Sequence, residues 1–106
     1  MTDSLLNDWK KEEILPYNMK LFISGASPNS VRAIANLKNI CEKYLGTGYE
    51  LEIIDVYQQP KLAINEQIIG LPMLIKYFPL PVKRFFGDLS DTPKVLKGLG
   101  LNVKNG

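Results

Sequence analysis

Two hydroxyls in one turn and a single thiol are the candidate nucleophiles that the pattern of this sequence singles out. Ser27 and Ser30 stand three residues apart in the turn 25–30, and Cys41 is the chain's single cysteine. A serine needs a neighbouring base to attack a substrate, and the sequence contains no histidine. A lone cysteine forms no disulfide within the chain. We therefore expect a capped helix start at the serines and an inert, packed thiol at Cys41, although Lys, Asp, Glu or Tyr could still serve as bases.

The segments around this turn predict a strand, a helix and a second strand. Residues 19–24 form an apolar run, Ser27 suits a helix N-cap, and Pro28 suits the first helical position, where its missing N–H is not needed. Gly46 is expected to end the helix, and residues 49–56 form the second strand. Two strands joined by one helix make a right-handed parallel unit. The helix is expected to bury one apolar stripe, made of Val31, Ile34, Leu37, Cys41 and Tyr44.

The second half of the sequence is less decided. Residues 62–69 suit a short helix or a strand, because the apolar pattern does not separate the two. Pro72 precedes the apolar run 73–75, and two further prolines predict a hairpin loop whose return strand covers 82–86.

A last helix is expected after a cap at Ser90 or Asp91, with Gly98 inside it and Gly100 at its end. A glycine within a helix costs about 1 kcal/mol relative to alanine. From the sequence alone, Gly98→Ala should therefore favour a state in which residue 98 is helical.

Composition and charge narrow the class of protein. The chain has 106 residues, 45% of them hydrophobic, which suits one compact domain. Its net charge of +2 is too small to indicate nucleic-acid binding. No apolar run approaches the ~20 residues of a membrane span, and no signal peptide is evident. We expect a cytoplasmic protein that needs no cofactor or metal and binds neither nucleic acid nor membrane.

Basic and aromatic residues alternate around the predicted hairpin. Such a group can bind nucleic acid or form an aromatic and arginine-rich protein interface. A half-buried hairpin with solvated charges is the plainer alternative. The residues are Lys76, Tyr77, Phe78, Lys83, Arg84, Phe85 and Phe86.

The first 18 residues are polar and mixed. We expect a partly ordered tail, and the alternative is a segment that Trp9 anchors and whose residues 14–17 pack on the edge of the domain.

The order of elements resembles a thioredoxin-like domain, in which a helix start lies at the carboxyl edge of the sheet and a proline faces it. On that resemblance we expect the peptide bond before Pro72 to be cis. A redox enzyme of this fold needs a low-pKa thiolate at the helix start, where this chain has Ser27 and Ser30. The sequence thus predicts a scaffold without redox chemistry, no disulfide reductase activity and a binding function.

Several sequence blocks carry a more specific resemblance. They are KLFISGASPNSVRA at 20–33, IIDV at 53–56, PKLA at 60–63, LPML at 71–74 and PLPVKRFFGDLS at 79–90. In their order and spacing the chain resembles the KaiB family of cyanobacterial clock components over residues 20–101.

This resemblance implies properties that the composition does not show. KaiB proteins are non-enzymatic partners of KaiC, a hexameric RecA-like ATPase, and they help to sequester KaiA. They are metamorphic: one state is a homotetramer, and a rarer thioredoxin-like state binds KaiC. The expected fold is α/β, with a thioredoxin-like βαβ first half and a C-terminal half that rearranges. We expect an N-terminal extension over 1–18 and a KaiB-like domain over 19–103.

The resemblance also assigns residues. The family's functional basic positions fall on Arg32, Lys76, Lys83 and Arg84, and its partner-facing second strand runs from Tyr49 to Glu52. Glu52 stands where the cyanobacterial pattern has a lysine. The expected structural and switch positions are Pro72, Gly98 and Gly100, and Gly100 replaces an acidic residue.

We therefore expect a KaiB-type regulator of a KaiC-like ATPase, forming homodimers or homotetramers, in a circadian clock or clock-derived stress signalling. KaiA is a possible further partner through the KaiC complex. The alternative is a thioredoxin-like adaptor that docks on another signalling protein, such as a sensor kinase. A redox or glutathione-type enzyme is the third and least favoured interpretation.

Overall fold

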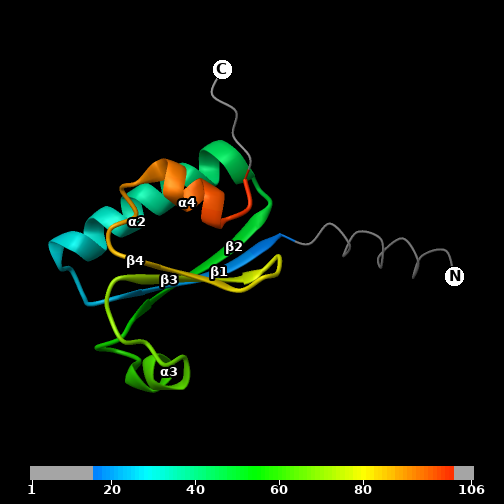
Figure 1. Cartoon of the computed structure of the whole chain (residues 1–106). Coiled ribbons are helices and arrows are strands. Elements are labelled where there is room, and N and C mark those ends of the chain that lie inside the picture. The colour runs from blue at the N-terminus through cyan, green and yellow to red at the C-terminus, as the bar shows by residue number, and fades with distance from the viewer. Residues whose placement is uncertain (1–15, 102–106) are drawn as a thin grey trace, which may run out of the picture.

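A four-stranded mixed sheet with helices on both faces forms the structure, a computed structural model that describes residues 16–101 (Figure 1). Strand β1 (Tyr17–Ile23) lies inside the sheet, parallel to β2 (Tyr49–Asp55) and antiparallel to β3 (Met73–Phe78). Strand β4 (Lys83–Phe86) pairs antiparallel with β3. The strand order is β2-β1-β3-β4, so β2 and β4 are the two edges. This is the α/β arrangement that the sequence predicts.

The first half follows the predicted βαβ unit closely. Helix α2 (Pro28–Ile40) begins where the Ser27 hydroxyl accepts the amide hydrogen of Ser30 at 3.3 Å. It continues into the π-helical turn η1 (Cys41–Leu45), which ends at Gly46. Strand β1 begins two residues before the predicted start, so part of the expected extension 1–18 belongs to the sheet. The tail and the alternative role of Trp9 as an anchor lie outside the described residues.

The predicted buried stripe of α2 is wrong at its first position. Val31 is 53% exposed, whereas its neighbour Ser30 is completely buried. The reason is local, since hydrogen bonds to other serines satisfy the Ser30 hydroxyl and allow a polar side chain to face the core. The remaining buried positions of the helix are Ala33, Leu37 and Ile40.

In the second half of the chain, the structure decides between the alternatives that the sequence leaves open. Helix α3 (Pro60–Asn65) is short and has no buried residue, so 62–69 is neither a strand nor a full helix. The Leu71–Pro72 peptide bond is cis, as expected, and the bonds before Pro79 and Pro81 are cis too. Helix α4 (Thr92–Gly98) is capped by Asp91, whose carboxylate accepts the amide hydrogen of Lys94 at 3.3 Å.

Two apolar clusters hold these layers together, one on each face of the sheet. On the face covered by α2 and α4, buried side chains come from the sheet and both helices: Met19, Leu21, Ile23, Ala33, Leu37, Ile40, Cys41, Leu74, Leu89, Val95, Leu96 and Leu99. The other face, beneath α3, buries Phe22, Ile54, Met73 and Ile75. The larger cluster therefore fixes α4 against the first half of the chain.

Two glycines shape the end of α4. Gly100 has a φ of +80°, its N–H donates to the Lys97 carbonyl, and the N–H of Leu101 donates to the Leu96 carbonyl. This pattern is a Schellman C-cap, which requires a left-handed residue after the helix. Gly98 is the last helical residue, and a Cβ added there would lie 2.7 Å from Cζ of Phe85 and closer still to its Cε2. Steric contact at Phe85 therefore opposes the predicted gain from Gly98→Ala.

Candidate functional site

The hydroxyls at the start of α2 form a closed hydrogen-bond network. Ser27 donates to the Ser30 oxygen at 2.8 Å, and that oxygen also accepts the Ser24 N–H at 3.1 Å. Within residues 16–101, no acidic or basic side chain hydrogen-bonds to these three hydroxyls. The network therefore caps the helix and does not activate a nucleophile.

Cys41 is fully buried in the cluster beneath α2 and α4. Burial first, and the neighbouring Glu42 carboxylate second, raise the pKa of its thiol to about 11. The thiolate is thus disfavoured at neutral pH, which fits the inert packed thiol that the sequence predicts.

Asp55 joins the ends of the two parallel strands. Its Oδ1 accepts the N–H of Gly25 at 3.2 Å and the N–H of Tyr57 at 2.9 Å. One carboxylate oxygen therefore fixes both the turn before α2 and the turn after β2.

The predicted basic group is divided between the two faces of the sheet. Lys76 is 2% exposed on the face of α2 and α4, where its ammonium group donates to the Pro79 carbonyl. Lys83 pairs with Lys76 across the strands and is exposed. Burial first, and the Lys83 charge second, lower the pKa of Lys76. Lys76 therefore cannot serve as a free surface cation in this arrangement.

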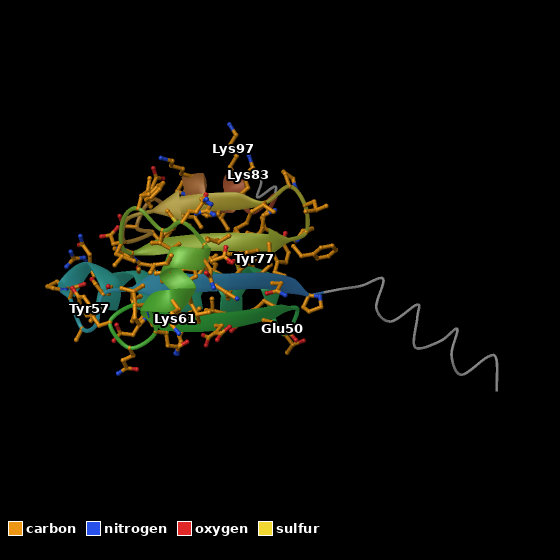
Figure 2. All side chains as sticks on the ribbon, turned by 90° about the horizontal axis from the view of Figure 1, so that it is seen from below. Glu50, Tyr57, Lys61, Tyr77, Lys83 and Lys97 are labelled. Atoms are coloured by element: carbon orange, nitrogen blue, oxygen red, sulfur yellow. The ribbon has the colours of Figure 1, made fainter. Side chains whose placement is uncertain are left out.

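Arg84 lies on the other face because successive strand residues point to opposite sides. Its Nη2 donates to the Glu66 carbonyl at 2.9 Å, and its Nη1 lies 3.5 Å from the Met73 sulfur. This side chain ties the segment after α3 to the edge of the sheet. In Figure 2, Lys83 lies near Lys97 at the β4 edge, and Glu50 lies at the opposite edge.

Arg32 connects α2 to the loop between β4 and α4. Its Nε lies 3.2 Å from Oδ2 of Asp88, and Asn36 donates to the Asp88 carbonyl at 2.9 Å. Hydrogen bonds from Ser90 chiefly, with a further contribution from Arg32, lower the pKa of Asp88. Arg32, Lys76 and Arg84 thus hold three different junctions, and the four predicted basic residues do not converge on one site.

The predicted partner-facing strand is the exposed edge strand β2. Tyr49 packs against the cluster beneath α2, whereas Glu52 is exposed on the opposite face. Glu52 is the register partner of Lys20 in β1, and the Lys20 ammonium lies 5.6 Å from the centroid of the Tyr77 ring. The acidic residue at position 52 therefore matches the local charge of the sheet.

An apolar surface surrounds the cis proline, and we call it the cis-proline face. It comprises Ile69 (86% exposed), Leu71 and Phe86 (57% exposed). The N–H of Gly87 donates to the Pro72 carbonyl, which fixes β4 beside the cis-proline loop. Arg32 reaches Asp88, the residue after Gly87, and Arg84 stands two residues before Phe86 on β4, so charged residues border the apolar ones.

Sequence reasoning missed most of this face. Ile69 and Leu71 resemble ordinary core residues in the sequence. The available signal was their position beside Pro72, which a thioredoxin-like fold turns toward the start of α2. Exposed apolar residues with a polar border are typical of protein interaction sites.

Other types of site find little support in the part of the chain that the structure describes. Between residues 16 and 101, His, Cys, Asp and Glu form no group of three or more that could hold a metal ion. Over the same range, none of the helices has the length and apolar character needed to cross a bilayer.

Comparison with known proteins identifies the family. The family description "KaiB domain" matches residues 20–101, most of the chain. This chain belongs to the KaiB family. The circadian clock oscillator protein KaiB of Synechococcus elongatus is 51% identical over 85 residues, which cover 80% of this chain and 83% of that KaiB protein.

Solved structures place this KaiB-family chain among thioredoxin-like folds. The N-terminal domain of Synechococcus elongatus SasA has a TM-score of 0.66 at 25% identity, covering 87% of this chain and 90% of that domain. Mitochondrial thioredoxin 3 of Saccharomyces cerevisiae has a TM-score of 0.66 at 13% identity, covering 91% and 90% of the two chains. The likeness to the thioredoxin shows the fold alone. At the start of α2, this chain has serines.

Proposed function

We propose that this chain is a non-enzymatic KaiB-type regulator that binds a hexameric KaiC-like ATPase through the cis-proline face. The names of its relatives favour a role in a circadian clock or a clock-derived signalling system. The observation that carries the proposal is the exposed apolar face, in a KaiB-family chain whose helix start has serines where redox enzymes have a reactive thiol.

The size of the face limits how much of the binding it supplies. Complete burial of one Ile, Leu or Phe side chain contributes roughly 1.5–3 kcal/mol. Three such side chains give on the order of 6 kcal/mol, comparable with the 4–15 kcal/mol lost as rigid-body freedom on association. Apolar contacts alone therefore give weak binding. Arg32 and other side chains at the border, which order and orient the partner, supply the rest.

The thioredoxin-like arrangement is the binding-competent state in this proposal, and a homodimer or homotetramer is the competing state. If only a fraction f of the chains has the competent arrangement, the apparent affinity falls by the factor 1/f. Binding should therefore be slow and should strengthen when the arrangement described above is stabilised. The regulator is cytoplasmic in this proposal, with its KaiB-like domain over 19–103.

A second surface, the edge strand β2, is where KaiA could join the complex. Its exposed face carries Glu50 and Glu52, so it would select a partner segment with basic residues. The lysine of the cyanobacterial pattern would select the opposite charge. The proposed KaiC-like partner does not depend on this surface.

A matched pair of variants tests the ATPase proposal. Ile69→Ser and Ile64→Ser remove the same side chain from positions that are 86% and 74% exposed, but only Ile69 belongs to the cis-proline face. In surface plasmon resonance with the cognate KaiC-like hexamer, Ile69→Ser should weaken binding by roughly tenfold, as expected for about 1.4 kcal/mol of lost contact. Ile64→Ser should bind as the wild type does. Equal affinities for all three proteins would refute the proposed face, and a lack of binding by the wild type would refute the partner.

The likeness to the SasA domain favours one alternative, an adaptor that docks on another signalling protein such as a sensor kinase. Co-purification from the native host distinguishes the two candidates, because a KaiC-like hexamer and a kinase differ in mass and in nucleotide chemistry. An insulin-reduction assay tests the non-enzymatic claim, and turnover above the buffer blank would contradict it.

A further inference from the structure

The tip of the β3–β4 hairpin exposes apolar side chains at the end of the sheet opposite the cis-proline face. Leu80 is 72% exposed and Val82 is 50% exposed, and both lie in the loop 79–82 between the two strands. Phe78, the last residue of β3, is only partly buried. Apolar side chains grouped at a tip and left in water favour association with another surface.

The N-terminal segment of the chain enters the sheet beside this tip. Asn18 in β1 is the register partner of Phe78, so the strand that carries Asn18 begins next to the loop that follows Phe78. Pro16 and Phe78 also line the same cleft, together with Asn18 and Glu50. Figure 1 shows the start of β1 alongside the hairpin between β3 and β4. The described structure therefore begins, at Pro16, beside the apolar tip.

Residues 1–15 contain apolar side chains and negative charge, which complement the exposed apolar and basic residues of the tip. Four acidic residues and two lysines give the segment negative side-chain charge, whereas exposed Lys83 and buried Lys76 lie beside the tip. The segment lies outside the residues 20–101 that match the KaiB domain. Fifteen residues can extend to about 50 Å, so a tip that lies beside their attachment point is well within reach. Its apolar residues, besides the first, are Leu5, Leu6, Trp9, Ile14 and Leu15.

We propose that residues 1–15 dock on the hairpin tip of their own chain, with their apolar side chains covering Leu80 and Val82. Attachment at Pro16 makes this contact intramolecular, with an effective concentration in the millimolar range for a short flexible connection. A second copy is a poorer occupant, because two tips placed face to face would bring their Lys83 charges together. The docked segment covers one apolar surface and leaves the cis-proline face open for a partner.

Trp9, the only tryptophan of the chain, reports on this contact directly. In the full chain, its fluorescence should be blue-shifted and less quenched by acrylamide than that of a peptide of residues 1–15. The double variant Leu80→Ser/Val82→Ser should shift the emission to the red and raise quenching to the level of the peptide. Ile64→Ser, which removes an equally exposed apolar side chain from α3, should leave Trp9 unchanged.

A second measurement approaches the contact from the segment and leaves the folded residues intact. Leu5→Ser/Leu6→Ser should move the methyl resonances of Leu80 and Val82, whereas the polar control Asn7→Ser should not. Quenching of wild-type Trp9 equal to that of the peptide would overturn the proposal, as would methyl resonances indifferent to the segment. Protection of Trp9 that grows with protein concentration, in step with the sedimentation coefficient, would assign the cover to a second copy and would also overturn it.

Discussion

For Gly98→Ala, the structure and helix propensity predict opposite changes in the free energy of unfolding. Propensity alone favours alanine by up to about 1 kcal/mol at a position within a helix. In the structure, Gly98 is the last residue of α4, and the ring of Phe85 occupies the space where a Cβ would lie. The helix therefore approaches β4 closely because residue 98 has no side chain.

The steric effect decides the sign. Forcing an extra carbon into a well-packed contact costs roughly 1–3 kcal/mol. The gain in propensity is smaller at the end of a helix than inside it, so we expect Gly98→Ala to lower the free energy of unfolding by about 1 kcal/mol. Phe85 packs against the larger core cluster, which limits how far its ring can turn away.

A double-mutant cycle with Phe85→Ile separates the two effects. Isoleucine suits a strand and shortens the side chain that meets residue 98. In this background Gly98→Ala should become neutral or stabilising, which gives a coupling free energy of about 1–2 kcal/mol. Urea unfolding followed by circular dichroism measures all four proteins, and Lys97→Ala on the same helix is the control that leaves the contact unchanged. Sedimentation at the same concentration detects any change of assembly.

Two results would refute this reasoning. Gly98→Ala could stabilise the chain while Phe85 is still present, which would mean that the ring moves without cost. Alternatively, the effects of the two substitutions could add within about 0.3 kcal/mol, which is the behaviour of sites that do not touch.

Three further predictions concern the backbone and charges. Gly100→Ala should lower the free energy of unfolding by about 1 kcal/mol, because φ is +80° at this C-cap, and the midpoint of urea unfolding will show it. Lys76→Met should raise stability by about 1 kcal/mol, because it removes a buried cation opposed by Lys83. Because the folded state lowers the pKa of Lys76, the free energy of unfolding of the wild type should rise as the pH increases from this folded-state pKa to the ordinary value of 10.5. Urea titrations at several pH values should show no such rise in Lys76→Met. The depressed pKa of Asp88 stabilises the fold above the ordinary aspartate value of 3.8, and this contribution disappears as the pH falls through the folded-state pKa, so acid unfolding of Asp88→Asn should lack that component.

The first half of the fold follows from local sequence signals. A serine followed by proline marks the start of α2, Gly46 marks the end of its continuation η1, and the two flanking apolar runs become β1 and β2. The sequence did not predict which face of α2 is buried, because the burial of Ser30 depends on hydrogen-bond partners in the turn before it.

The candidate site was harder to predict because it depends on contacts between distant segments. Strand alternation already implies that Lys83 and Arg84 point to opposite faces. The burial of Lys76 and the exposure of Ile69 have no such local signal, because they depend on how the β3–β4 hairpin and α3 pack on the sheet. Family resemblance names functional positions but does not say which of them meet in a given arrangement.

The central place of β1 has a consequence for the order in which the chain folds. Its parallel partner β2 is reached across a single helix, whereas its antiparallel partner β3 follows only after the whole first half has been made. Closing a longer loop costs about 0.6 kcal/mol for each doubling of its length, so the β1–β2 pair should form first. In the resulting intermediate, the βαβ unit is formed and one edge of β1 stays unpaired until β3 binds to it. Pulsed hydrogen exchange should accordingly protect the amides of β2 before those of β4. The rate at which the second half docks on β1, more than the stability of the βαβ unit, would then decide which conformation the second half adopts.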